Sequence, residues 1–369
     1  MGRFRHGLIV GKFYPPHAGH HLLVEAAAAR CREVTVVVAP SSRESVPLAL
    51  RLRWLREVHA ATPRVRFVGC QDDHAVDYGD PAAWDAHCAT FRTVLGDVDV
   101  DAVFSSEGYG PELARRFGAV HVAVDDARRT ARVSGTAVRA DPVGNWPWLA
   151  APVRAWFTRR VVVVGAESTG TTTLARALAG HYRLRGGVWA GTRWVPEYGR
   201  TRTEDKLAEA RQLDPAADVS GLTWDADDFR MVAAEQIAAE EAAARVGSPL
   251  LFCDTDAFAT TIWEQRYRGV TSPEVRALGA RQPGCAPRLY LLTGDEGVPF
   301  HDDGWRDGEH LRAWMTGRFR DELTATGRTW LPLPARHSDR LRTAIAVCDA
   351  LIAQGWQLAD PLPQRNQPA

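Results

Sequence analysis

The chain has 369 residues, of which 45% are hydrophobic and 24% charged, and its 45 basic side chains balance its 45 acidic ones. This length is typical of two domains, and the neutral balance argues against a nucleic-acid partner. The longest apolar runs are too short to cross a bilayer, no C-x-x-C pair occurs, and a strand pattern begins almost at the first residue. We therefore expect a cytoplasmic protein with no membrane partner.

The first 150 residues alternate short β-branched runs with helical patterns. Strands are predicted at 7–13, 34–40, 64–70, 101–106 and 120–126. The alternation restarts after a tryptophan-rich junction, with strands predicted at 161–165, 187–197, 249–256, 287–294 and 329–335 and a long helix over 227–247. Such alternation is typical of βαβ units and parallel sheets. The sequence thus predicts an α/β fold with two tandem domains, residues 1–153 and 158–360, followed by a frayed tail at 361–369.

Residues 11–20 form the pattern G-x-F-x-P-x-H-x-G-H, which includes Phe13, at the end of the first predicted strand. His17 and His20 are three residues apart, so both imidazoles fall on one face of a first helical turn, where the backbone N–H groups favour anions. Gly11 and Gly19 let the backbone approach a ligand. Two histidines at this spacing are by themselves typical of an exposed helix start, but the complete pattern indicates a triphosphate site.

A second motif lies at residues 133–142, VSGTAVRADP. Ser134 and Thr136 are suited to cap a helix or donate to phosphate, and Arg139 follows on the first helical turn. Alone, this pattern is typical of a cap with a solvated arginine. Together with the histidine motif, it resembles the nucleotidyltransferase superfamily of adenylyl- and cytidylyltransferases, in which two such turns grip the ATP phosphates from opposite sides.

The stretch VVVVGAESTGTTTLARALA, residues 161–179, resembles a P-loop, G-x-x-x-x-G-K-[ST]. Gly165, Gly170 and Thr172 take their places in it, with Thr173 next in the same turn, but Thr171 stands where a P-loop has lysine. The backbone amides can still cradle phosphates and the Thr172 hydroxyl can still reach Mg²⁺. The missing cation removes an interaction of roughly 1.5–3 kcal/mol.

Polar and aromatic residues near this loop extend the second predicted site. Asp254 and Asp256 end a strand, as carboxylates that hold Mg²⁺ or accept a proton do, although such a pair is also common as a helix cap. Thr172 and Asp254 are the predicted magnesium ligands. The predicted substrate-binding residues are Glu197 and Tyr198 after the neighbouring strand, Asp303 further along the chain, and Trp263 and Trp305 as stacking platforms for a cationic ring.

The segments GKFYPPHAGH, FSSEGYG, RRTARVSGTAVRADP and NWPWL, followed by the P-loop-like stretch, resemble the NadR family, which joins a nicotinamide-mononucleotide adenylyltransferase to a ribosylnicotinamide kinase. The resemblance implies a Rossmann-like nucleotidyltransferase sheet, then a P-loop NTPase-like sheet, with ATP and Mg²⁺ as cofactors. It implies nicotinamide mononucleotide, ribosylnicotinamide and NAD as further small-molecule ligands. In the first domain it implies that the ATP phosphates are held by Lys12, His17, His20, Ser134, Thr136 and Arg139, with Ser106 and Glu107 near the nucleoside. Residues 299–309 resemble the kinase lid, with Asp303, Gly304 and Arg306 matching its D-G-x-R core.

Members of that family often carry a helix-turn-helix segment in front, whereas this sequence begins directly at the first strand, so we expect no DNA-binding role. Two alternatives to the bifunctional enzyme stay open. One is an adenylyltransferase with a nucleotide-sensing pseudokinase domain, because the P-loop lysine is missing. The other is a ligand-responsive regulator without catalysis. The sequence also leaves open whether the chain forms a homo-oligomer.

Overall fold

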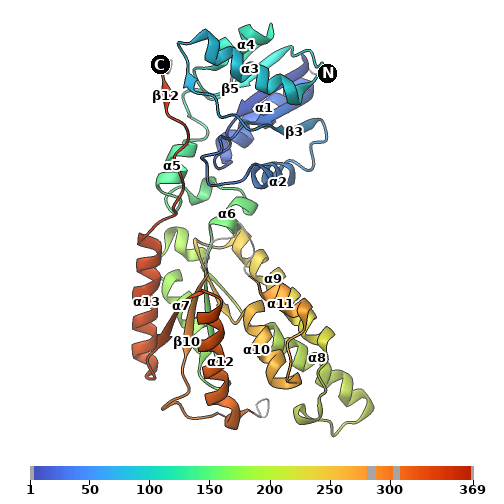
Figure 1. The fold of residues 1–369 in the computed structure, drawn as a ribbon, viewed down its shortest axis with the longest axis vertical. Coiled ribbons are helices and arrows are strands. Elements are labelled where there is room, and N and C mark those ends of the chain that lie inside the picture. Colours follow the sequence, from blue (N-terminus) through green and yellow to red (C-terminus); the bar gives the residue numbers. More distant parts are fainter. Residues whose placement is uncertain (1–3, 281–287, 302–307, 367–369) are drawn as a thin grey trace. The chain divides into compact units, whose positions relative to one another are not determined.

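The computed structural model describes residues 4–280, 288–301 and 308–366, and the chain divides into two compact units. The first unit consists of Met1–Val153 together with Trp356–Ala369, and the second of Arg154–Gly355. Both units are α/β, and their described strands pair in parallel, which confirms the predicted fold class (Figure 1).

The first unit is built on a five-stranded sheet with the order β3-β2-β1-β5-β6. Its central strands are buried on both faces, because helices cover both sides of a parallel sheet. Ile9 packs on one face with Leu23 and Leu55, whereas Leu8 packs on the other with Phe91. The strands are β1 (Phe4–Gly11), β2 (Cys31–Val38), β3 (Val65–Gly69), β5 (Ala102–Ser105) and β6 (Val120–Ala123). The helices are α1 (Ala18–Arg30), α2 (Leu48–Val58), α3 (Pro81–Leu95), α4 (Gly110–Phe117), α5 (Gly135–Ala140) and the 3-10 turn η1 (Trp146–Trp148), while α6 (Ala151–Phe157) spans the boundary between the units.

The end of the chain differs from the predicted frayed tail. Strand β12 (Gln364–Arg365) pairs in parallel with β4 (Val76–Asp77), forming a separate two-stranded sheet in the first unit. Backbone pairing with β4 holds this segment in place. Figure 1 shows β12 as the red strand near the carboxyl end of the chain. A two-residue strand leaves no periodic pattern, so the sequence did not predict it.

The second unit has a five-stranded sheet with the order β11-β10-β7-β9-β8. The valine run at 161–164 in β7 is almost completely buried, as expected for a central parallel strand. The strands are β7 (Arg159–Gly165), β8 (Arg193–Val195), β9 (Leu250–Asp254), β10 (Leu289–Thr293) and β11 (Thr329–Leu333). The α-helices are α7 (Thr171–Arg183), α8 (Tyr198–Leu213), α9 (Ala226–Val246), α10 (Ala257–Arg268), α11 (Pro273–Gly279), α12 (Arg312–Ala325) and α13 (His337–Ala353). Short 3-10 turns are η2 (Gly187–Gly191), η3 (Val219–Gly221) and η4 (Glu309–Leu311).

Among the helices described, not one combines the length and the apolar character that crossing a membrane requires.

Candidate functional site

The first unit holds a cavity of about 510 Å³ at the carboxyl ends of β1 and β5. Ligands of open parallel sheets bind at this edge, because the loops that follow the strands converge there. The cavity brings together the residues predicted for the first site, namely Gly11, Lys12, Phe13, His17, Gly19, His20, Ser106, Glu107, Ser134, Thr136 and Arg139.

The histidine motif forms the turn between β1 and α1. His17 is the N-cap residue of α1, its backbone N–H donates to His20 Nδ1 over 3.3 Å, and the two ring centroids lie 3.8 Å apart. Phe13 has a left-handed backbone, with φ 49°, and its ring lies against His20. A Cβ at Gly19 would come within 3.2 Å of the His17 ring, so the glycine allows this close packing.

The imidazoles of this turn are neutral at pH 7 in the absence of a ligand. Burial, reinforced by neighbouring positive groups, lowers the pKa of His17 to about 3 and the pKa of His20 well below its ordinary value. A neutral imidazole still has one N–H to donate. The turn is therefore suited to donate hydrogen bonds to an anion without carrying a charge of its own.

The second motif meets the first through Arg139. Ser134 is the N-cap of α5 and accepts from the Ala137 N–H over 3.1 Å. Arg139 donates to the Tyr14 carbonyl over 2.8 Å and to the Thr136 hydroxyl over 3.2 Å. The guanidinium therefore joins two segments that are more than a hundred residues apart in the sequence, beside the same cavity.

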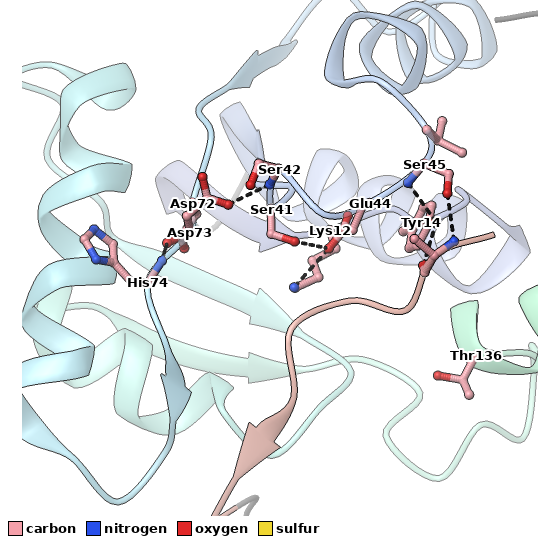
Figure 2. Close-up of polar contacts among 12 residues, drawn as sticks. Lys12, Tyr14, Ser41, Ser42, Glu44, Ser45, Asp72, Asp73, His74 and Thr136 are labelled. Atoms are coloured by element: carbon pink, nitrogen blue, oxygen red, sulfur yellow. Dashed lines mark hydrogen bonds and ion pairs between the residues drawn. The ribbon is translucent and has the colours of Figure 1, made fainter.

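A buried carboxylate that the sequence did not single out holds Lys12. Glu44 and Arg51 have fully buried side chains, and Arg51 Nη1 lies 2.5 Å from Glu44 Oε2. Lys12 Nζ donates to the other Glu44 oxygen over 3.0 Å, as Figure 2 shows. Neither Glu44 nor Arg51 belongs to a motif, so no local signal identified them. The lysine is oriented by this pair at the cavity wall.

Another set of cavity residues also lacks a sequence motif. His87 Nδ1 lies 2.6 Å from Asp72 Oδ2, and the rings of Tyr78 and Trp84 lie 6.0 Å apart at 65°. All four line the cavity. A carboxylate, an imidazole and an aromatic pair give this part of the wall a chemistry different from that of the histidine turn and the turn that carries Arg139.

The second unit has a cavity of about 250 Å³ beside the P-loop-like segment. It brings together several of the predicted residues, namely Gly165, Thr171, Thr172, Glu197, Asp254 and Trp263. Arg200, Trp224 and Tyr267 line it as well and were not predicted as substrate-binding residues. Gly170, Thr173 and Tyr198 do not line it. The Tyr198 N–H instead donates to Gln236 at the start of α8.

The loop has the strand–loop–helix context that a P-loop requires. It leaves β7 at Gly165, where an added Cβ would come within 2.1 Å of Thr293 Oγ1, and enters α7 after Gly170, which has φ 84°. Both glycines are therefore needed for the path of the backbone. From α13, Arg340 donates to the Thr169 carbonyl and fixes the loop from outside the cavity.

Thr172 and Asp254 are in contact, with 2.5 Å between the hydroxyl and Oδ2. Burial raises the pKa of the Asp254 carboxyl, while hydrogen bonds from Thr172 and Thr171 oppose this shift. A hydroxyl and a carboxylate are hard oxygen ligands, and Mg²⁺ commonly takes one or two such protein ligands together with nucleotide phosphates and water. The pair fits a magnesium ion, although no group of three or more His, Cys, Asp or Glu side chains suited to a metal occurs among the described residues.

Asp256 lies outside this cavity, contrary to the catalytic role predicted for it. Its side chain caps α10 by accepting from the Ala259 N–H, and it also accepts from the Tyr290 hydroxyl over 2.8 Å. Arg288 Nη1 lies 3.3 Å from the same carboxylate. Thr255, with φ 68°, turns the backbone between the two aspartates. Asp256 is therefore a structural cap, which was the alternative interpretation of the pair.

The remaining predicted residues of the second site, Asp303, Trp305 and Arg306, lie outside the described part of the chain, as does the rest of the D-G-x-R core.

Comparisons with known proteins agree with this arrangement. Residues 160–340 match the family model of the AAA domain. The chain is 26% identical over 289 residues to the trifunctional NAD biosynthesis/regulator protein NadR of Escherichia coli (strain K12), which covers 74% of this chain and 65% of that protein. A crystal structure of NadR protein in complex with NR has a TM-score of 0.67 at 21% identity, over 98% of this chain and 99% of that one. The chain is NadR-like.

A second solved structure, of NadR protein in complex with NAD and AMP-PNP, has a TM-score of 0.64 at 21% identity and covers 94% of the NadR-like chain and 95% of its own. A probable nicotinate-nucleotide adenylyltransferase of Mesorhizobium japonicum is 39% identical over 79 residues, 20% of this chain and 40% of that protein. The NadR-like chain spans about 65% of the length of the E. coli relative.

Proposed function

We propose that this NadR-like protein is an enzyme of NAD biosynthesis with two activities. Its first unit transfers the adenylyl group of ATP to nicotinamide mononucleotide, giving NAD and pyrophosphate, and its second unit phosphorylates ribosylnicotinamide with ATP. The observation that carries the proposal is the meeting of the histidine turn and the S-G-T-x-x-R turn at one cavity through Arg139. The similarity to a NadR protein of NAD biosynthesis and to NadR structures in complex with NR, or with NAD and AMP-PNP, supports it.

In the proposed adenylyl transfer, an oxygen of the mononucleotide phosphate attacks the α-phosphorus of ATP in line. The bond from this phosphorus to the bridging oxygen breaks, and pyrophosphate leaves with the electron pair. No covalent enzyme intermediate is required, so the protein contributes positioning and stabilisation of negative charge. Arg139 supplies a fixed cation, while His17 and His20 supply N–H donors.

The test of this activity is the formation of NAD and pyrophosphate from ATP and nicotinamide mononucleotide by the purified full chain. Nicotinate mononucleotide is assayed in parallel, to measure the preference between the amidated and the acid substrate. A folded protein that forms neither dinucleotide would exclude the adenylyltransferase and favour the regulator without catalysis.

The kinase activity is proposed for the second cavity, where Thr172 and Asp254 would hold Mg²⁺ next to the nucleotide phosphates. When bound, the ion would neutralise part of the phosphate charge. Arg200 lines the same cavity and is the described arginine best placed to supply the charge that Thr171 lacks. Arg306 of the lid-like segment, which the family resemblance suggested, is a second candidate.

The kinase assay compares wild type with Thr171→Lys, Arg200→Ala and Arg306→Ala, using Mg-ATP and ribosylnicotinamide. If an arginine replaces the lysine, its alanine variant should lose phosphate transfer and Thr171→Lys should help only modestly. If nothing replaces the lysine, Thr171→Lys should raise a feeble wild-type rate by roughly one to two decades, equivalent to about 1.4–2.7 kcal/mol. A second unit that stays inert in all four proteins would favour the nucleotide-sensing pseudokinase.

A further inference from the structure

Residues 356–366 follow the second unit in the sequence but belong to the first unit. Their first anchor is Ala359. The Tyr14 hydroxyl donates to the Ala359 carbonyl over 2.8 Å, and the Ala359 N–H donates to Ser45 Oγ over 2.7 Å. Ser45 in turn donates its own N–H to the Tyr14 hydroxyl over 3.0 Å. Figure 2 shows Tyr14 and Ser45 side by side at this end of the segment.

The second anchor is strand β12. Besides the pairing of β12 with β4, the Tyr78 N–H donates to the Arg365 carbonyl over 3.1 Å. The Asn366 side-chain amide donates to Asp77 Oδ1 over 2.8 Å. The segment is thus fixed at two places in the first unit by hydrogen bonds to both main chain and side chains.

From Ala359 to strand β12, residues 356–366 border the first cavity. Pro361 and Gln364 line it together with Arg139 and Tyr78. The anchors also lie on functional parts of the wall. Tyr14 offers its carbonyl to Arg139 in the anion-binding turns, whereas Tyr78 belongs to the aromatic pair with Trp84. The segment therefore extends from the anion-binding part of the wall to the aromatic part.

We propose that Pro361 and Gln364 form a wall of the adenylyltransferase cavity that positions the acceptor mononucleotide, and that the Gln364 carboxamide contacts its base. This inference rests on the proposed function of the first unit. The two substrates differ in chemistry, because ATP brings a triphosphate and the acceptor brings a flat cationic ring. The triphosphate suits the donors of the two turns, and the cationic ring suits an aromatic pair. Gln364 pairs with Val76, two residues before Tyr78, which places it at the aromatic end.

A glutamine at this position also bears on the choice of substrate. Its carboxamide both donates and accepts hydrogen bonds, so it can pair in both directions with the carboxamide of a nicotinamide. A nicotinate carboxylate can only accept. Loss of the Gln364 side chain should therefore weaken binding of the amidated mononucleotide more than binding of the acid form.

The test measures the dissociation constant of nicotinamide mononucleotide by calorimetry, together with KM and kcat, in the full chain. Gln364→Ala should raise both the dissociation constant and KM for this substrate about tenfold, or about 1.4 kcal/mol, with kcat within a factor of two and KM for ATP unchanged. Arg365→Ala is the matched control. Side chains of adjacent strand residues point to opposite faces, and Arg365 does not line the cavity. A chain ending at Gly355 should show a larger rise in the dissociation constant and in KM for nicotinamide mononucleotide than Gln364→Ala does.

Unchanged dissociation constants and KM values in both Gln364→Ala and the shortened chain would overturn the inference. So would an effect of the same size in Arg365→Ala, because it would show a general loss of structure. If the wild type binds the mononucleotide without converting it, the proposed function fails, but the dissociation constants of the variants still test whether Pro361 and Gln364 contribute to binding. A folded wild type that neither binds nor converts it overturns both.

Discussion

At the scale of single residues, the charge state of two histidines matters for the adenylyl transfer proposed for the first cavity. His17 is buried and His20 half-buried, both are neutral at pH 7 because their pKa values are lowered, and they offer N–H donors at a helix start. Negative charge that develops on a phosphate during transfer would strengthen these hydrogen bonds, because donors fixed in a site with little water need no reorganisation.

Replacement of His20 tests this role. We expect His20→Ala to lower kcat for adenylyl transfer by about 10²-fold or more, the effect of losing one stabilising donor. His74→Ala, at an exposed histidine of the same unit that does not line the cavity, serves as the control. Steady-state rates of pyrophosphate release measure the effect. Near-normal turnover in a folded His20→Ala protein would contradict the assignment.

Buried histidines also predict how stability depends on pH. Burial lowers the pKa of His21 to about 4, below the value of about 6.5 in an unfolded chain. Between these values the unfolded state binds more protons than the folded state, so the free energy of unfolding falls as the pH falls from 6.5 towards 4. At pH 5 the His21 imidazole alone lowers the free energy of unfolding by about 2 kcal/mol.

Urea denaturation at pH 7.5 and pH 5 of wild type and His21→Asn measures this contribution. Between pH 7.5 and pH 5, the free energy of unfolding of the wild type should fall by about 2 kcal/mol more than that of the variant. At pH 7.5 His21 is neutral, so the difference in the free energy of unfolding between the two proteins at that pH measures the altered packing and the lost hydrogen bond to His59. Equal losses in the two proteins would exclude His21 as a source of the pH dependence.

At the scale of elements, the end of β9 separates two aspartates that look equivalent in the sequence. Asp254 contacts Thr172 beside the P-loop-like segment, whereas Asp256 caps α10 and contacts Tyr290. We expect Asp256→Ala to destabilise the second unit by about 2–4 kcal/mol, because it removes a cap and leaves buried partners without their carboxylate. Asp254→Asn should change stability far less but abolish phosphate transfer.

Denaturation curves and kinase assays of both variants check this contrast, with AMP-PNP binding as a second measure of the site. A stable Asp256→Ala protein that cannot transfer phosphate would restore the catalytic role that the sequence predicted.

The two sheets could be predicted from the sequence because their strands are short apolar, β-branched runs that alternate with helical patterns. Many residues that line the first cavity could also be picked out from the sequence, because they lie in two compact motifs. The different positions of Asp254 and Asp256 could not, since alternation along a strand predicts one face for both. Thr255 ends that alternation with a left-handed backbone, φ 68°. Glu44 was missed because it meets Lys12 only through tertiary contacts.

At the scale of the whole molecule, the first unit is assembled from two stretches of chain with the second unit between them in the sequence. A fragment of residues 1–154 therefore lacks Pro361 and Gln364. We expect it to bind nicotinamide mononucleotide more than about tenfold more weakly than the full chain, and a synthetic peptide of residues 356–366 to restore part of the affinity.

Calorimetry of the fragment, with the peptide and with a scrambled version of it, measures this effect. A soluble, folded fragment with the full affinity of the intact chain would show that Met1–Val153 contains the complete binding site.

The hydrogen bonds that link Ala359 with Tyr14 and Ser45 also have a consequence for the order of events during protein synthesis. A ribosome makes the polypeptide from its amino end, so the sheet of the first unit leaves the ribosome long before Ala359 does. The whole second unit has to be translated before that residue exists. A nascent or prematurely terminated polypeptide therefore carries the histidine turn without Pro361 and Gln364, and the proposed mononucleotide site is completed only after the proposed kinase has been made.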